Sequence, residues 1–291
     1  PKAMREDLAK SFVIPHVKIE TKLVSQIDGT VKYLFRTPTN DYVEAVYIPD
    51  NDRATLCVSS QVGCRMNCYF CMTGKPGFKG NLTAAQIINQ ILSIPPKMPK
   101  GYEPMNELTN VVFMGMGEPL DNLYELLKVL EIMTAPWGMA WSPKRITVST
   151  VGKITELKEL LDRTQVHIAI SVHSADPMQR ASMMPVQKAY PIQGVMKLLA
   201  GYDFSHQRRL SLEYIMWRNV NDSAKYSEAL VKLIGRLDCR FNLIRFHAIP
   251  GSDLQPSTTA VMERFRDSLN QHGITATIRA SRGEDIMAAC G

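Results

Sequence analysis

Residues 145–172 read RITVSTVGKITELKELLDRTQVHIAISV and hold one complete unit of the pattern that organises the chain. Apolar, β-branched runs occupy residues 145–149 and 167–172, whereas residues 155–161 space their leucines as one face of a helix does. A strand, a helix and a second strand in this order indicate a parallel pair, because parallel neighbours need a long crossover connection. The stretch therefore predicts one β-α-β unit.

The same alternation continues on both sides of this unit. Further strands are predicted at residues 55–59, 110–114, 210–216, 241–246 and 274–278, and further helices at 83–93, 122–133, 192–201, 223–235 and 257–271. Some six alternations favour an α/β fold whose parallel sheet curls into a partial or complete (βα)6-type barrel. An open doubly wound sheet is the alternative.

The first fifty residues follow a different pattern. A short helix is expected at residues 3–11, and alternating strands at 16–25, 30–36 and 43–48, with a turn at 27–30 between the first two. We therefore divide the chain into an N-terminal helix and β extension, residues 1–50, and a barrel core, residues 51–291.

Composition excludes several classes of protein. The 291 residues are 45% hydrophobic and 21% charged, and no apolar run reaches the roughly 20 residues of a membrane span. A net charge of +6 permits a polyanionic partner such as RNA. Six cysteines are too few for a disulfide scaffold of this size. No secretory signal is visible, so a cytoplasmic location is expected.

Three of the cysteines lie close together, in the order Cys64-x3-Cys68-x2-Cys71. Three thiolates can hold three corners of a cubane iron-sulfur cluster, which normally has four cysteine ligands, and would leave one iron open. A structural zinc ion usually takes four protein ligands. From spacing alone, a cluster, a zinc ion with a distant fourth ligand and structural thiols all remain open.

Other polar motifs follow the predicted strands, where parallel α/β folds carry their active sites. Gly115-Met116-Gly117-Glu118-Pro119 comes after the second strand of the core, Ser149 ends the third, and Ser171 to His173 end the fourth. Taken singly, each has an ordinary reading as a tight turn or a strand-end hydrogen-bonding group. Together they predict a site at one end of the sheet.

These motifs resemble those of known enzymes. The cysteine spacing, with the aromatic Phe70 before the last cysteine, resembles the signature of radical S-adenosylmethionine (SAM) enzymes. Residues 56–64, 113–119 and 283–291 resemble the RlmN/Cfr family of RNA adenine methyltransferases. The resemblance implies a radical-SAM barrel with a 4Fe-4S cluster on Cys64, Cys68 and Cys71, and two SAM molecules consumed per turnover.

The family's reaction assigns roles to three further residues. Carbon 2 of adenine is electron-poor, so the family uses a radical: a cysteine is methylated first, and hydrogen abstraction from its S-methyl group gives the carbon radical that attacks the ring. By resemblance, Cys290 carries the methyl group and Cys57 attacks Cys290 to release the product, leaving a disulfide. Glu44 matches the family's proton acceptor.

The resemblance also implies contacts to SAM. These would come from Gly117, Glu118, Ser149, Ser171, Val172 and His173. His247 stands where relatives often have an asparagine, and imidazole can replace an amide because each ring nitrogen can donate or accept a hydrogen bond.

Substrates and partners follow by resemblance as well. The expected activity is methylation of adenine carbon 2 in 23S rRNA, with tRNA as a second candidate substrate. Electrons would come from an external flavodoxin-type donor, and a monomer without membrane attachment is expected. Relatives carry an upstream accessory RNA-binding domain, most of which we expect to be absent here. The alternatives are a Cfr-type carbon-8 methyltransferase, disfavoured by Pro119, and a non-catalytic zinc-stabilised RNA-binding protein.

Overall fold

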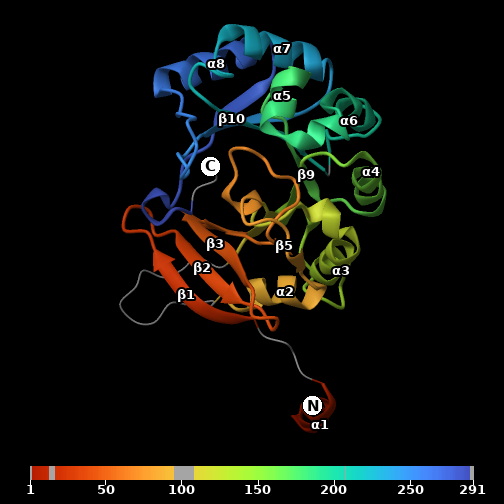
Figure 1. The fold of residues 1–291 in the computed structure, drawn as a ribbon. Coiled ribbons are helices and arrows are strands. Elements are labelled where there is room, and N and C mark those ends of the chain that lie inside the picture. Colours follow the sequence, from red (N-terminus) through yellow and green to blue (C-terminus); the bar gives the residue numbers. More distant parts are fainter. Residues whose placement is uncertain (1, 13–16, 95–107, 207, 289–291) are drawn as a thin grey trace.

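The computed structural model describes residues 2–12, 17–94, 108–206 and 208–288. Within these ranges, ten strands form one sheet in the order β1-β2-β3-β4-β7-β8-β9-β10-β11-β12 (Figure 1). From β4 onward all neighbours are parallel. The parallel strands are β4 (Arg53–Cys57), β7 (Asn110–Phe113), β8 (Ile146–Thr150), β9 (His167–Ser171), β10 (Leu210–Met216), β11 (Arg240–Arg245) and β12 (Thr275–Ile278).

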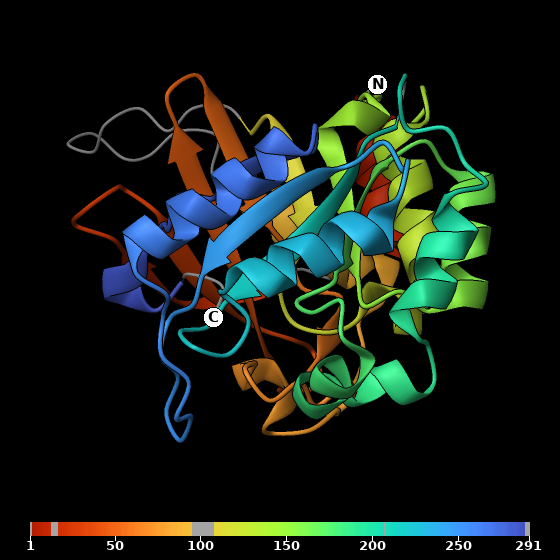
Figure 2. The same cartoon turned by 90° about the horizontal axis from the view of Figure 1, so that it is seen from above.

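The helices lie outside this curved sheet and follow one another around it (Figures 1 and 2). They are α2 (Ala84–Leu92), α3 (Leu123–Thr134), α4 (Ile154–Arg163), α6 (Ile192–Leu199), α7 (Ala224–Ile234) and α8 (Thr259–Gln271). In a barrel the helices cover only the outer face of the sheet, as they do here, whereas a doubly wound sheet has helices on both faces. In the described residues β12 pairs with β11 alone, so the barrel is a partial one.

One helix was missed by the sequence analysis, α5 (Pro177–Met183). Its seven residues are too few to display a period, but Asp176 caps it by accepting a hydrogen bond from the Gln179 amide at 2.7 Å. Asp followed by Pro at the first helical position is a known helix start, and this signal was overlooked. No helix in the described part of the chain has the length and hydrophobicity to cross a membrane.

The predicted N-terminal extension forms the antiparallel end of the same sheet. It consists of β1 (Lys18–Val24), β2 (Val31–Arg36) and β3 (Tyr42–Asp50), and β3 pairs with β4. On β2 every second side chain is buried and its neighbours are half-buried, as expected of a strand with one face on the core. The preceding helix α1 (Lys2–Ser11) buries no residue. A small second sheet pairs β5 (Gln61–Val62) with β6 (Gly80–Asn81).

Candidate active site

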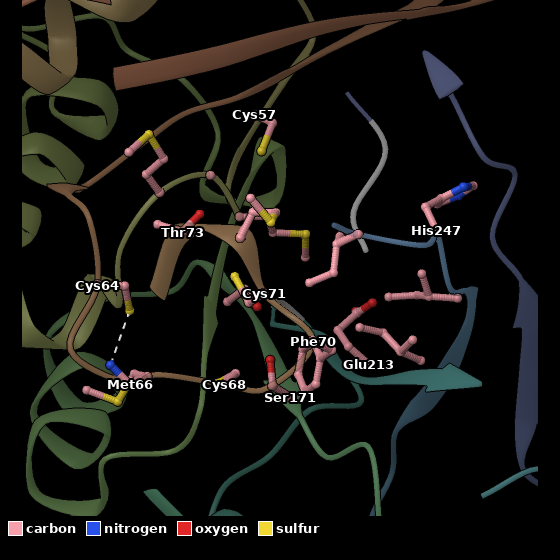
Figure 3. Close-up of a pocket in the computed structure, with 18 of the residues that line it drawn as sticks. Cys57, Cys64, Met66, Cys68, Phe70, Cys71, Thr73, Ser171, Glu213 and His247 are labelled. Carbon is pink, nitrogen blue, oxygen red and sulfur yellow. Dashed lines mark hydrogen bonds between the residues drawn. The ribbon is translucent and has the colours of Figure 1, made fainter. Parts of the chain in front are cut away.

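A cavity of about 650 Å³ opens at the carboxyl ends of the parallel strands. This volume is typical of sites for small molecules and cofactors. Figure 3 shows side chains from different elements around it. Most site residues predicted from the sequence line it, namely Glu44, Cys57, Cys64, Cys68, Cys71, Gly117, Glu118, Ser149, Ser171, His173 and His247.

Two predicted residues are not among those lining the cavity. Val172 is fully buried in the hydrophobic core, and its backbone carbonyl accepts a 3.0 Å hydrogen bond from Arg180 Nε. Cys290 lies outside the described residues. The described chain ends at Ala288, which does line the cavity, two positions before Cys290 in the sequence.

The three-cysteine loop is fixed to the barrel by its own backbone and by aromatic packing. Tyr69 donates its amide to the Met183 carbonyl of α5 at 2.9 Å, and the Phe70 ring packs edge-on against His173 with centroids 4.9 Å apart. Cys71 donates its amide to the Cys68 carbonyl at 3.1 Å, which closes a turn. These contacts fix the backbone of the loop, and its three thiols point to the cavity.

The donor chemistry of this loop fits an iron-sulfur cluster. Burial raises the pKa of the Cys64 thiol to about 11 and raises that of Cys68 as well, so these groups need a nearby positive centre to become thiolates. Within the described ranges, no group of three or more His, Cys, Asp or Glu side chains converges enough to hold a single metal ion. A cubane does not need such convergence, because each thiolate binds a different iron.

The Gly-Met-Gly-Glu segment after β7 packs against residues 58–61 too closely for side chains. A Cβ on Gly117 would lie 2.5 Å from Gln61 Cβ, and one on Gly115 would lie 2.7 Å from the Val58 carbonyl oxygen. Gly117 also has a φ of +100°, which residues with a Cβ rarely adopt. Both glycines are therefore required for this loop to pack against residues 58–61.

Glu118 is buried and its carboxylate is held by the protein. Oε1 accepts hydrogen bonds from the Thr150 hydroxyl at 2.5 Å and the Leu120 amide at 3.1 Å, and Oε2 accepts one from the Val151 amide at 3.0 Å. Burial nevertheless raises the pKa of Glu118 to about 7. A cationic ligand beside this carboxylate would favour its ionised form.

His173 is a neutral, oriented imidazole at the end of β9. Burial, with a contribution from Arg180, lowers its pKa to about 3. Its Nδ1 accepts a 3.1 Å hydrogen bond from the Ile215 amide, so the ring proton lies on Nε2. Ser171, two residues earlier, lines the cavity from the same strand end.

His247 lies near the C-terminal segment, at the right of Figure 3. Its Nε2 is 3.0 Å from the Ser281 hydroxyl oxygen and 3.9 Å from Glu284 Oε1. Burial lowers its pKa, so it is largely neutral at neutral pH. A neutral imidazole can make the hydrogen bond expected of the amide it replaces.

Cys57 and Glu44 face the cavity from neighbouring strands. Cys57 on β4 stands opposite Val46 on β3, and Glu44 lies two residues before Val46 on the same face of the strand. The Ser59 hydroxyl donates a 2.6 Å hydrogen bond to the Glu44 carbonyl and accepts one from the Met116 amide at 2.9 Å. Ser59 thus ties the strand that carries Glu44 to the glycine loop.

Glu213 on β10 lines the cavity and was not singled out from the sequence. Its Oε1 accepts hydrogen bonds from Ser211 at 2.9 Å and Asn242 at 2.8 Å, while its buried Oε2 has no hydrogen-bond partner within the described ranges. Burial raises its pKa. The signal in the sequence that could have identified Glu213 was an acidic residue inside a largely apolar strand.

Arg180 on α5 was also missed. It is fully buried and spans the ends of two strands, donating to the carbonyls of Val151, Ser171 and Val172 at 3.1, 2.9 and 3.0 Å. A fourth hydrogen bond of 2.7 Å goes to Gln187 Oε1. Arg180 therefore fixes the backbone from which Ser171 projects.

The C-terminal segment returns to the N-terminal extension (Figure 1). After β12 it forms the short 3-10 turn η5 (Glu284–Ile286). Asp285 accepts hydrogen bonds from the Ser25 hydroxyl and the Gln26 amide, and the Gly283 amide donates to Asp28 Oδ2 at 2.8 Å. These contacts place Met287 and Ala288 at the cavity.

Known proteins are similar to this chain over most of its length. Residues 58–225 match the Radical SAM superfamily. The probable dual-specificity RNA methyltransferase RlmN of Parabacteroides distasonis is 61% identical over 264 residues, which cover 91% of this chain and 75% of that protein. The corresponding protein of Phocaeicola vulgatus is 60% identical over 91% of this chain and 74% of its own length.

One solved structure is similar over the whole chain. It is a radical SAM methyltransferase from Sphaerobacter thermophilus, 35% identical in sequence, with a TM-score of 0.92. The match covers 100% of this chain and 85% of that one.

Proposed function

Because the chain belongs to the radical SAM superfamily and, within it, to the RlmN family of RNA methyltransferases, we propose that it methylates carbon 2 of adenine. It is a radical SAM-dependent RNA methyltransferase, and this family implies a 4Fe-4S cluster and SAM. The choice of carbon 2 rests on the RlmN relatives, and the observation that carries the proposed radical methyl transfer is the shared cavity. Cys57, Glu44 and the segment leading to Cys290 line the same space as the three-cysteine loop.

The cofactors would be held by residues of that cavity. Cys64, Cys68 and Cys71 would bind the cluster, and the ionised Glu118 would receive the SAM ammonium group. Gly117, Ser149, Ser171, His173 and His247 would make the remaining contacts, with Val172 contributing through its backbone. When bound, the cluster supplies the electron that cleaves SAM into the radical that activates the methylated cysteine, with two SAM molecules consumed per turnover.

Three residues of the chain then complete the transfer. Once the Cys290-borne carbon has joined carbon 2, the adduct must lose one electron, which returns to the oxidised cluster, and one proton, which Glu44 accepts. The Cys57 thiolate attacks the Cys290 sulfur, and the bond between that sulfur and the transferred carbon breaks. The electron pair stays on carbon, which takes up a proton to become methyl. A Cys57–Cys290 disulfide remains. A two-electron thiol reductant then reduces this disulfide and restores both thiols.

Substrate and partners complete the proposal. Relatives named dual-specificity RNA methyltransferases support two kinds of RNA substrate. We propose that these are 23S rRNA and tRNA. The protein would act as a monomer in the cytoplasm and take electrons from a flavodoxin-type donor. Residues 1–50 would serve as the extension that receives the C-terminal segment, and residues 51–291 as the catalytic core.

The test is the identity of the methylated nucleoside. Reconstituted enzyme, SAM and a 23S rRNA fragment are incubated, and the digested RNA is separated by chromatography with mass detection. The proposal expects 2-methyladenosine. A product that is only 8-methyladenosine would establish the carbon-8 alternative, and a colourless protein that binds RNA with stoichiometric zinc and no product would establish the binding-protein alternative.

A further inference from the structure

Lys32 connects two segments that line the cavity, although it does not line the cavity itself. Its ammonium nitrogen lies 3.6 Å from Glu44 Oε1 and donates a 3.1 Å hydrogen bond to the backbone carbonyl of Met287. Only 12% of the Lys32 side chain is exposed. Lysine is rarely buried to this extent unless its ammonium group is paired, and these two contacts provide the partners.

The strand register explains why Lys32 reaches both groups. Val46 on β3 stands opposite Lys32 on β2 and opposite Cys57 on β4. Directly opposite residues project from the same face of a sheet, so these three side chains form a row across three strands. Glu44 lies on that face, two residues from Val46. The C-terminal segment crosses the row where Lys32 meets Met287.

We propose that Lys32 is a positioning residue, which holds the Glu44 carboxylate beside the C-terminal segment that carries Cys290. This inference rests on the proposed function. Attraction between opposite charges restricts the carboxylate to rotamers near the ammonium group, and the bond to Met287 fixes the segment at the same point. The proton acceptor and the methyl-carrying cysteine then approach the adenine together. Lys32 itself keeps its protons, and no bond to it forms or breaks.

The proposal predicts a defect in one step of the reaction. Lys32→Met should slow release of the covalent protein-RNA adduct about tenfold, a coupling within the usual range for contacting residues. Methylation of Cys290 without RNA, followed by protein mass, should change little, because Asp285 and Asp28 still anchor the segment. Lys32→Arg keeps the charge and should restore most of the release rate.

A double-mutant cycle on the release rate separates positioning from general stability. Single turnovers with a 23S rRNA fragment are compared for wild type, Lys32→Met, Glu44→Gln and the double variant. The double variant should be no slower than Glu44→Gln, because Lys32 acts through that carboxylate. Lys18→Met is the matched control, since Lys18 pairs with Glu20 at 3.8 Å on β1 but is 66% exposed; it should behave as wild type.

Several results would overturn the proposal. These are additive slowing in the double variant, a release rate in Lys32→Met equal to wild type, and a defect in Lys32→Arg as large as in Lys32→Met. Normal release by all Lys32 variants alongside 2-methyladenosine formation would refute this inference alone. A wild-type enzyme that forms no 2-methyladenosine would refute the proposed function and this inference with it.

Discussion

The hydroxyl of Ser25 donates a 2.7 Å hydrogen bond to the carboxylate of Asp285, 260 positions later in the chain. Ser25 follows β1, at one edge of the sheet, and Asp285 follows β12, at the other. In the described residues these edges do not pair as strands. The side-chain contact therefore joins the two ends of the partial barrel and brings the C-terminal segment to the cavity.

Removing this contact should impair the first methyl transfer. Asp285→Ala loses the acceptor for both Ser25 and the Gln26 amide, so the segment before Cys290 should dock less often and the rate of Cys290 methylation should fall several-fold. The rate is measured by protein mass after mixing with SAM and reductant. Asp267→Ala, an exposed carboxylate on α8, is the control, and equal rates in the two variants would contradict the docking role.

Gly117→Ala should weaken SAM binding about tenfold, since overpacking typically costs about 1–3 kcal/mol. The new Cβ would meet Gln61 at 2.5 Å and force the loop that carries Glu118 to move. Equilibrium dialysis with labelled SAM measures the affinity. Gly273→Ala shares a positive φ, +77°, but has open space around the added Cβ, and should bind normally. Normal binding by Gly117→Ala would rule out the close approach.

The free energy of unfolding should depend on pH through Glu118. Its pKa is about 7 in the folded chain and 4.5 ordinarily, so the folded state binds the extra proton between these values. The resulting stabilisation is fully present below pH 4.5 and is lost as the pH rises through 7. Urea unfolding of the cluster-free protein measures this dependence. Between pH 5 and pH 8 the free energy of unfolding of the wild type should fall by roughly 2.5 kcal/mol more than that of Glu118→Gln. Parallel pH profiles for the two proteins would contradict the raised pKa.

Arg180→Met should destabilise the fold by at least about 3 kcal/mol. Three buried backbone carbonyls would each lose a hydrogen bond from a charged donor, worth about 1.5–3 kcal/mol. The Val172 carbonyl keeps its second bond, from the Ser174 amide at 2.7 Å. Urea unfolding measures the change. Arg163→Met, which breaks an exposed pair with Glu159 on α4, should stay within about 0.5 kcal/mol of wild type. If both substitutions had the same small effect, the bridging role of Arg180 would be wrong.

Much of the fold could be predicted from the sequence, because local patterns encode it. Buried parallel strands are continuous apolar runs and their helices are amphipathic, so the predicted strands and helices of the core agree with the structure to within about two residues at each end. The α5 helix was missed because it is short and its central residue, Arg180, is buried by pairing with carbonyls rather than by an apolar face.

The site could be predicted only in part. Strand-end motifs and resemblance identified the three cysteines and the glycine loop, because each of these motifs is a short continuous stretch of sequence. Lys32 and Asp285 were not identified, because their partners are Met287 and Ser25, more than 250 residues away. Glu213 depends on Asn242 of the next strand, and such pairings arise from tertiary structure that no local pattern specifies.

The most direct test of the account is the product of Cys57→Ala with RNA. This variant keeps Cys290, Glu44 and the three-cysteine loop, so it should methylate Cys290, form the carbon radical and join it to adenine. Without the Cys57 thiolate the sulfur cannot be released. Mass analysis after nuclease and protease digestion should find adenosine linked through one carbon to Cys290. Full turnover to 2-methyladenosine by Cys57→Ala, with no such adduct, would contradict the account.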